Sequence, residues 1–313
     1  MSIYEYKRHI KRILGKAGLD SRGFTTPRRD RHVSDHALDT AAVIRGLERK
    51  PAIIIHGVMP RSGTVYTGEI LRLHPELGAY PNDVWEVPFL ELTGDLMEVQ
   101  EHFFQAYKQN RGKIGNNDFL PLFGASLIAH LYSYLPEGKR MLLKIPDVQY
   151  LNFFNVVFPY ENIILLMRDG RDVVNSTVRT WPERKFSDVC RLWDYSARMI
   201  LKYNKDNTDI TNRYLSVKYE DVVRDPECFA INVCKHFMLD DKIYPYGRIQ
   251  DISVRGSSTI KNEGKVTWKA VEKPNNFSSV GCWQNWSIKQ KKIFKKIAGQ
   301  TLIESGYCDD LQW

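Results

Sequence analysis

The sequence has no long apolar run and few cysteines, and both absences limit what this protein can be. No stretch reaches the roughly 18 apolar residues of a membrane span. The basic N-terminus also lacks an apolar core of signal-peptide length. None of the five cysteines has only two residues between it and another, which argues against a zinc site. Because an odd and sparse set of thiols is typical of a reducing compartment, we expect a cytoplasmic protein without a membrane span.

The composition is that of an ordinary globular protein with a surplus of positive charge. Hydrophobic residues make up 43% of the 313 residues and charged residues 26%, which is enough apolar material for one large core. Lysine and arginine number 45 against 37 acidic residues, so the formal net charge is +8. This surplus is compatible either with solubility alone or with an anionic ligand. Charge by itself does not choose between a nucleotide, a nucleic acid and a membrane surface.

Short apolar runs alternate with helical patterns from about residue 51 onward. We expect strands within 51–57, 140–144, 162–167 and 214–219. Helical patterns cover 65–77, 88–110, 118–134, 148–158, 186–205, 226–237 and 287–306. This alternation predicts one α/β domain over 51–313, with a mostly parallel sheet flanked by helices. Residues 1–50 form an N-terminal extension, and its polar, arginine-rich part 19–50 is expected to be irregular.

A glycine-containing turn joins the first expected strand to the helix that follows it. The turn contains Arg61-Ser62-Gly63-Thr64. Gly63 lets the main chain curl around an anion, Arg61 adds a cationic fork, and the helix N-terminus offers free N–H groups. The phosphate loop of nucleoside triphosphatases requires Gly-Lys-Ser/Thr, whereas Gly63 is followed here by Thr64. Since ligands of such sheets bind beyond the carboxyl ends of strands, the turn is a candidate phosphate loop, although a glycine turn also occurs there without a ligand.

The end of the third expected strand carries a second candidate anion site. Arg168 directly follows the run 162–167, and Ser176 lies eight residues later in a segment that begins a helix. The helical turns could bring Ser176 back beside Arg168, and a guanidinium with a hydroxyl is a suitable phosphate clamp. The alternative is a surface salt bridge from Arg168 to Asp169 or Asp172.

Four segments follow one another in an order that is known from one enzyme family. PRSGT, at 60–64, is similar to that family's loop for a 5'-phosphosulfate, and RDGRDVVNS, at 168–176, to its 3'-phosphate motif. YEDVVRDPE, at 219–227, resembles its Tyr-Glu-Asp segment, and the ending from GCWQNWS onward resembles its Gly-x-Trp and closing helix. The chain therefore resembles the sulfotransferases that depend on 3'-phosphoadenosine-5'-phosphosulfate (PAPS). PRSGT and RDGRD are closer to the tyrosylprotein and carbohydrate enzymes than to the steroid/phenol group.

The resemblance implies a P-loop-like sulfotransferase fold, PAPS as the donor and adenosine 3',5'-bisphosphate (PAP) as the product. It implies that the donor is held by Arg61, Ser62, Gly63, Thr64, Val65, Arg168, Ser176, Tyr219 and Ser258. Tyr219 is carried over for the adenine side and Ser258 for the phosphate side. One departure is Cys282, because related enzymes often have a basic residue just before the tryptophan, which is Trp283 here.

The catalytic candidates are Lys144, Asp83, Glu86 and Arg61. Sulfuryl transfer is close to phosphoryl transfer, so positioning and electrostatic stabilisation should dominate, and no metal is expected. Lys144 would stabilise the bridging oxygen of the leaving phosphate, and Arg61 would hold the 5'-phosphate. The histidine that serves the steroid/phenol group is absent, because Lys144 is followed by Ile145. The resemblance to the Golgi-type enzymes therefore implies a base at Asp83, which stands nearest to the position of their glutamate. Glu86 is the alternative.

We expect a sulfotransferase that moves a sulfuryl group from PAPS, in line, to a hydroxyl or amine of a small-molecule acceptor. The alternatives are a sulfotransferase that acts on carbohydrate or protein tyrosine, a non-catalytic binder of nucleotides or nucleic acid, and a P-loop kinase. A nucleic-acid partner is not expected, because the basic residues sit in short loops and not in a stripe interleaved with aromatics. His56 is expected to be a packed strand residue. The sequence leaves the oligomeric state open.

Overall fold

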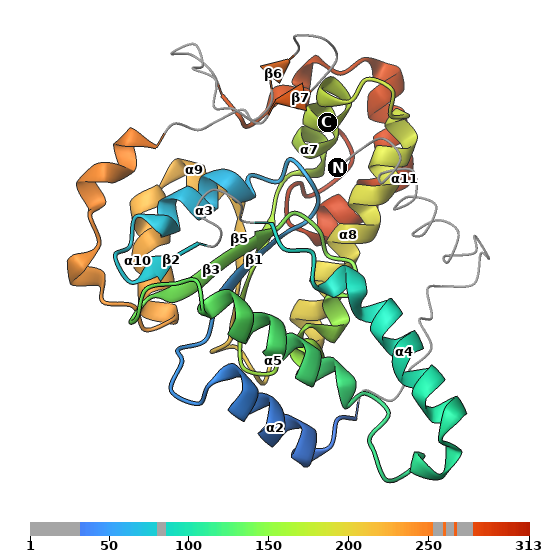
Figure 1. Ribbon diagram of the computed structural model, residues 1–313. Helices are drawn as coiled ribbons and strands as arrows, with labels where there is room; N and C mark the ends of the chain where they lie inside the picture. Colours follow the sequence, from blue (N-terminus) through green and yellow to red (C-terminus); the bar gives the residue numbers. More distant parts are fainter. Residues whose placement is uncertain (1–31, 80–85, 253–258, 261–265, 268–277) are drawn as a thin grey trace.

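A parallel sheet of five strands runs through the protein, whose computed structural model describes residues 32–79, 86–252, 259–260, 266–267 and 278–313 (Figure 1). The strands are β1 (Ile53–Gly57), β2 (Leu77–Gly78), β3 (Arg140–Ile145), β4 (Asn162–Met167) and β5 (Tyr214–Lys218). Their order across the sheet is β2-β3-β1-β4-β5. A separate antiparallel pair joins β6 (Thr259–Ile260) and β7 (Val266–Thr267).

Helices cover both faces of the sheet (Figure 1). The α-helices in the described part of the chain are α2 (Asp35–Arg45), α3 (Thr64–Arg72), α4 (Thr93–Ala106), α5 (Phe119–Tyr132), α6 (Phe154–Val157), α7 (Gly170–Thr180), α8 (Phe186–Asp206), α9 (Tyr219–Arg224), α10 (Pro226–His236) and α11 (Ile288–Glu304). Alternate residues of β1 serve the two layers. Ile54 packs in the cluster that includes α5, α6, α7, α8 and α11, and Ile53 and Ile55 pack in the cluster with α3, α9 and α10. Among the helices of the described ranges, none has both the length and the hydropathy to cross a membrane.

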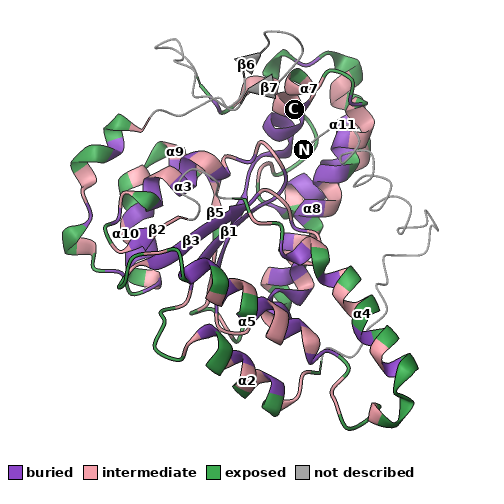
Figure 2. Ribbon diagram, in the orientation of Figure 1, coloured by how far each residue is buried: buried purple, intermediate pink, exposed green. Residues whose placement is uncertain are grey.

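The strands inside the sheet are buried over their whole length, whereas the edge strand β5 is not (Figure 2). Every residue of β1, β3 and β4 is buried, which explains their continuous apolar runs. No residue of β5 is buried, and Ser216 at its centre is exposed. The loops that follow β1, β3 and β4 all leave the same, carboxyl-terminal edge of the sheet.

The α/β architecture with a parallel sheet is confirmed, and each of the four expected strands is present. The expectation that 19–50 is irregular is wrong for Asp35–Arg45, which forms α2 and packs on α5. Sequence patterning missed this helix because its buried apolar residues are only Ala37 and Ala41. Its anchor is a buried ion pair of Arg45 with Glu161, whose atoms are 2.7 Å apart although the residues are 116 positions apart.

Candidate active site

The turn between β1 and α3 has the main-chain conformation of an anion loop. Gly63 has a φ of 94°, and a Cβ atom there would lie 2.2 Å from the ring of Tyr219, so only glycine fits. Ser62 is fully buried, and its hydroxyl has no hydrogen-bond partner within the described residues. Thr64 and Val65 begin α3, whose first N–H groups have no partner within the helix. The loop thus holds the unpartnered Ser62 hydroxyl next to the first N–H groups of α3.

Arg61 connects this loop to the second candidate anion site. Its φ of 80° is unusual for a residue with a side chain. The Arg61 Nε donates to the Ser176 hydroxyl at 3.0 Å, and the Arg168 guanidinium donates to the Arg61 carbonyl at 2.6 Å. Burial and the nearby charge of Arg168 lower the pKa of Arg61 to about 10, so it stays a cation at neutral pH. The two loops converge as expected, but the Ser176 hydroxyl contacts Arg61, where Arg168 was the expected neighbour.

Arg168 also fixes the aromatic wall of the site. Its guanidinium lies 4.4 Å from the ring centre of Tyr219 and donates to the Ser279 carbonyl at 2.6 Å. The Tyr219 hydroxyl is 3.1 Å from the Ser279 hydroxyl, and burial raises the pKa of Tyr219. The Arg168 Nε is buried without a hydrogen-bond partner in the described part of the chain. Sequence reasoning missed Ser279, and its only signal was its place just before the Gly-Cys-Trp segment.

The acidic residues after Arg168 have other partners. Asp169 binds the Arg171 guanidinium at 2.7 Å. Asp172 accepts the main-chain amides of Gly281 and Trp283 at 2.7 and 3.2 Å. The alternative in which Asp169 or Asp172 neutralises Arg168 in a surface salt bridge is therefore wrong. These carboxylates instead attach the segment around the Gly-Cys-Trp motif to α7.

Lys144 and Glu86 meet at the carboxyl end of β3. The Lys144 ammonium is buried and lies 2.5 Å from a carboxylate oxygen of Glu86, whose side chain is 57% exposed. Their main chains also form a parallel bridge. Lys144 is the register partner of Ile55 on β1, two residues before the end of the strand that leads into the first loop. Two other candidates, Asp83 and Ser258, lie outside the described residues.

His56 lies beneath the first loop and is packed as expected. Its ring is fully buried and meets the Phe154 ring edge-on. The Nδ1 atom is 2.8 Å from the Asp147 carbonyl, which can only accept, so Nδ1 carries the proton. Burial lowers the pKa of His56 to about 4, so the ring is neutral at physiological pH. His56 supports the site from within the core.

Known proteins resemble this chain over most of its length. Protein-tyrosine sulfotransferase A of Caenorhabditis elegans is 20% identical over 288 residues, which cover 89% of this chain and 71% of that protein. The sulfotransferase domain of the Synechococcus PCC 7002 olefin synthase is 18% identical with a TM-score of 0.49, covering 82% of this chain and 96% of that domain. Mouse sulfotransferase SULT7A1, complexed with PAP, is 13% identical with a TM-score of 0.46, covering 88% and 92%.

Both TM-scores are below 0.5, so the assignment rests on a family model. The model of the Sulfotransferase family matches residues 51–242, which is more than half of the sequence. This range includes both converging loops and the Lys144–Glu86 pair. The chain belongs to the Sulfotransferase family and is an enzyme of sulfuryl transfer, as its motifs predicted.

Proposed function

We propose that this enzyme transfers a sulfuryl group from PAPS to a hydroxyl or amine of a small-molecule acceptor. The observation that carries the proposal is the convergence of the two loops through Arg61. Its guanidinium binds Ser176 of the second loop at 3.0 Å, and its carbonyl accepts from Arg168 at 2.6 Å. Two cationic loops at the carboxyl edge of a parallel sheet suit a ligand with phosphates at both ends.

The donor atoms of the site fit PAPS. The 5'-phosphosulfate would be held by Arg61, the buried Ser62 hydroxyl and the first amides of α3, since that hydroxyl lacks a partner in the described residues. Arg168 and Ser176 would hold the 3'-phosphate, because the second loop presents the Ser176 hydroxyl and the Arg168 Nε, which has no hydrogen-bond partner among the described residues. Tyr219 would line the adenine side. Its burial and its contact with Gly63 support a wall and not a titrating group.

Lys144 and Glu86 supply the groups that the reaction needs. Lys144, whose own side chain is buried, would stabilise the bridging oxygen as the sulfur–oxygen bond to the phosphate breaks. Glu86 would take the proton of the acceptor as its oxygen or nitrogen bonds to sulfur, leaving PAP as the other product. We favour Glu86 over Asp83 because its carboxylate already lies 2.5 Å from the Lys144 ammonium.

The acidic residues that follow Glu86 in the sequence favour a small cationic molecule as the acceptor. Glu91 and Asp95 follow Glu86 along the same segment and add negative charge to it. Protein tyrosine is the second candidate, because the nematode relative is named a protein-tyrosine sulfotransferase. The cytoplasmic location expected from the sequence stays a prediction, which cell fractionation can check.

Binding and transfer are tested together. Calorimetry should show saturable binding of PAP at physiological salt, and Arg61→Ala should weaken it. Labelled PAPS with pooled cationic metabolites, and separately with tyrosine peptides, should label one pool. If PAP does not bind, and long polynucleotides bind with a steep salt dependence, the protein is a nucleic-acid binder and the proposal is wrong. If only the tyrosine peptides become labelled, the acceptor is protein tyrosine and not a small molecule.

A further inference from the structure

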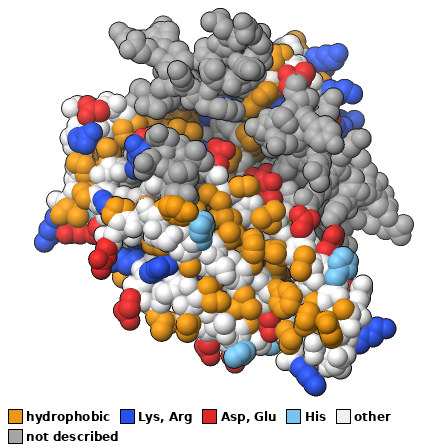
Figure 3. Space-filling model, viewed as in Figure 1, with side chains coloured by type: hydrophobic (Ala, Val, Ile, Leu, Met, Phe, Trp, Pro, Cys, Tyr) orange, Lys and Arg blue, Asp and Glu red, His pale blue; other side chains and the backbone are white. Residues whose placement is uncertain are grey.

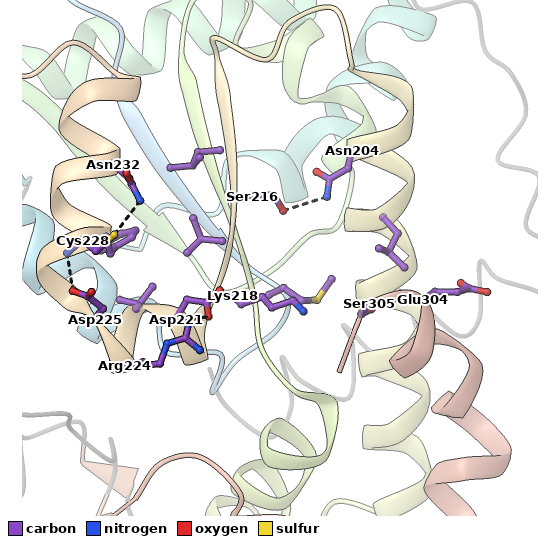
Figure 4. Close-up of a pocket in the computed structure, with 16 residues that line it drawn as sticks. Asn204, Ser216, Lys218, Asp221, Arg224, Asp225, Cys228, Asn232, Glu304 and Ser305 are labelled. Carbon is purple, nitrogen blue, oxygen red and sulfur yellow. Dashed lines mark hydrogen bonds and ion pairs between the residues drawn. The ribbon is translucent and has the colours of Figure 1, made fainter. Parts of the chain in front are cut away.

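A groove of about 580 Å³ runs along the edge strand β5 (Figure 4). Its walls come from β5, α8, α9, α10 and the end of α11. None of the described residues assigned above to the donor, nor Lys144 or Glu86, lines it. The groove is therefore separate from the proposed reaction.

The floor of the groove is an unpaired sheet edge. Ile163 of β4 donates its amide to the Arg213 carbonyl. In a parallel ladder alternate residues face the same neighbour, so Leu215 and Val217 also turn their amides and carbonyls toward β4. Tyr214 and Ser216 then turn theirs outward. Among the described residues, no strand pairs with β5 on that side.

Two polar side-chain atoms of the groove are buried without a partner. They are the Asn204 Oδ1 and the Ser305 hydroxyl, and neither has a hydrogen bond within the described ranges. Ser305 is only 9% exposed. The Asn204 amide nitrogen is already used, since it donates to the Ser216 hydroxyl at 3.2 Å. Buried polar atoms are almost always hydrogen-bonded, so polar groups of a guest or water molecules would complete these two.

Both walls combine apolar and polar side chains. The wall at α9 and α10 contains Val222 and Phe229, which pack on the same face of the sheet as Leu215 and Val217, and it also contains Asp225 and Asn232. The opposite wall, at α8 and the end of α11, presents the polar Asn204 and Ser305 (Figure 4) beside the apolar Leu201. A strand added to β5 points successive side chains at alternate walls, so both sets of its side chains meet apolar and polar groups.

The charge of the lining is opposite to that of the whole chain. The groove contains Lys218 and Arg224 against Asp221, Asp225 and Glu304, although the chain carries a net +8. Both cations are engaged: Lys218 donates to a main-chain carbonyl at 2.7 Å, and Arg224 pairs with Asp221 at 2.6 Å. The carbonyl does not cancel the charge of Lys218, so the two cations and three carboxylates sum to −1, with Asp225 and Glu304 on opposite walls (Figure 4). A basic side chain on the guest would complement it.

We propose that this groove binds an extended peptide segment of another protein, which pairs with β5 as a sixth strand. The segment contains apolar and polar residues and carries a basic residue. Main-chain pairing supplies the affinity in this mode of recognition, and the side-chain walls supply the selectivity. The site would attach this enzyme to a partner without obstructing its active site.

Selection of short phage-displayed peptides on the full-length protein tests the proposal. Ser216→Pro removes the outward amide of β5 and spares the ladder to β4, whereas Ser216→Ala is the matched control that keeps the amide. Enriched peptides should combine apolar and polar residues with a lysine or arginine. They should bind the alanine variant like the wild type and the proline variant at least about tenfold more weakly.

Hydrogen exchange on the wild-type protein gives a second readout that does not depend on how the proline variant folds. A synthetic copy of an enriched peptide should slow exchange of the Ser216 amide. The proposal is overturned if no peptide is enriched, if the Ser216 amide is not protected, or if the proline variant binds equally well. It is also overturned if the free protein dimerises in a Ser216→Pro-sensitive way, since the occupant is then a second copy of the chain.

Discussion

Replacing Lys144 by alanine removes the charge that we place at the breaking bond. The ammonium is held at the carboxyl end of β3, and its side chain is only 7% exposed. Because its full interaction arises only as charge builds on the leaving oxygen, its loss should lower kcat by about 10²–10³-fold, or about 3–4 kcal/mol. Glu86 loses its partner, but at 57% exposure it keeps its hydration, so stability should change by less than about 1 kcal/mol.

The assay compares turnover, PAP affinity and melting temperature in the same preparations. Turnover uses PAPS with the acceptor found in the screen, and PAP affinity should change far less than kcat. Lys139→Ala is the matched control, since Lys139 is a half-buried lysine just before the opposite end of β3 and contacts the Pro75 carbonyl. If kcat of the Lys144 variant stays near that of the wild type, or the Lys139 variant loses as much, the assigned role is refuted.

Three further predictions follow from the site and its support. Glu86→Gln should lower kcat by about 10²–10⁴-fold with an intact fold, and unchanged turnover in a pH series would remove Glu86 as the base. Arg168→Ala should raise the Kd of PAP at least about tenfold in calorimetric titration, because it removes a charged donor, and an unchanged Kd would contradict the clamp. Burial lowers the pKa of His56 from 6.5 to about 4, so the unfolded state binds more protons in that range. The free energy of unfolding should therefore fall by about 3 kcal/mol between pH 7 and 4, and denaturation of His56→Gln should lack this part of the fall.

Local patterns were sufficient for four of the five strands and for the positions of the two candidate anion loops, but they missed the two-residue strand β2 (Leu77–Gly78). The Ile53–Ile55 run predicted β1 because a strand buried on both faces is apolar throughout. Gly63 marked the turn because its φ of 94° and the nearby Tyr219 ring exclude a side chain. Such features depend on a few adjacent residues, so a single sequence is enough to predict them.

Features that depend on distant contacts were not readable in this way. The α2 helix has two alanines as its buried apolar face and is held by Glu161, far away in the chain. Ser279 belongs to the site because its carbonyl accepts a hydrogen bond from Arg168, which is distant in the sequence. The order of preference between the two candidate bases likewise follows from the contact of Glu86 with Lys144, which spans 58 positions.

Arg168 joins three stretches of chain that lie more than a hundred positions apart, through the carbonyls of Arg61 and Ser279. The proposed nucleotide site is therefore complete only once these three stretches of the polypeptide have folded together. Ligand and fold are then thermodynamically linked, and PAP should raise the melting temperature in proportion to the logarithm of its concentration. In a truncated chain that stops before residue 278, PAP should not raise the melting temperature even if the sheet still folds.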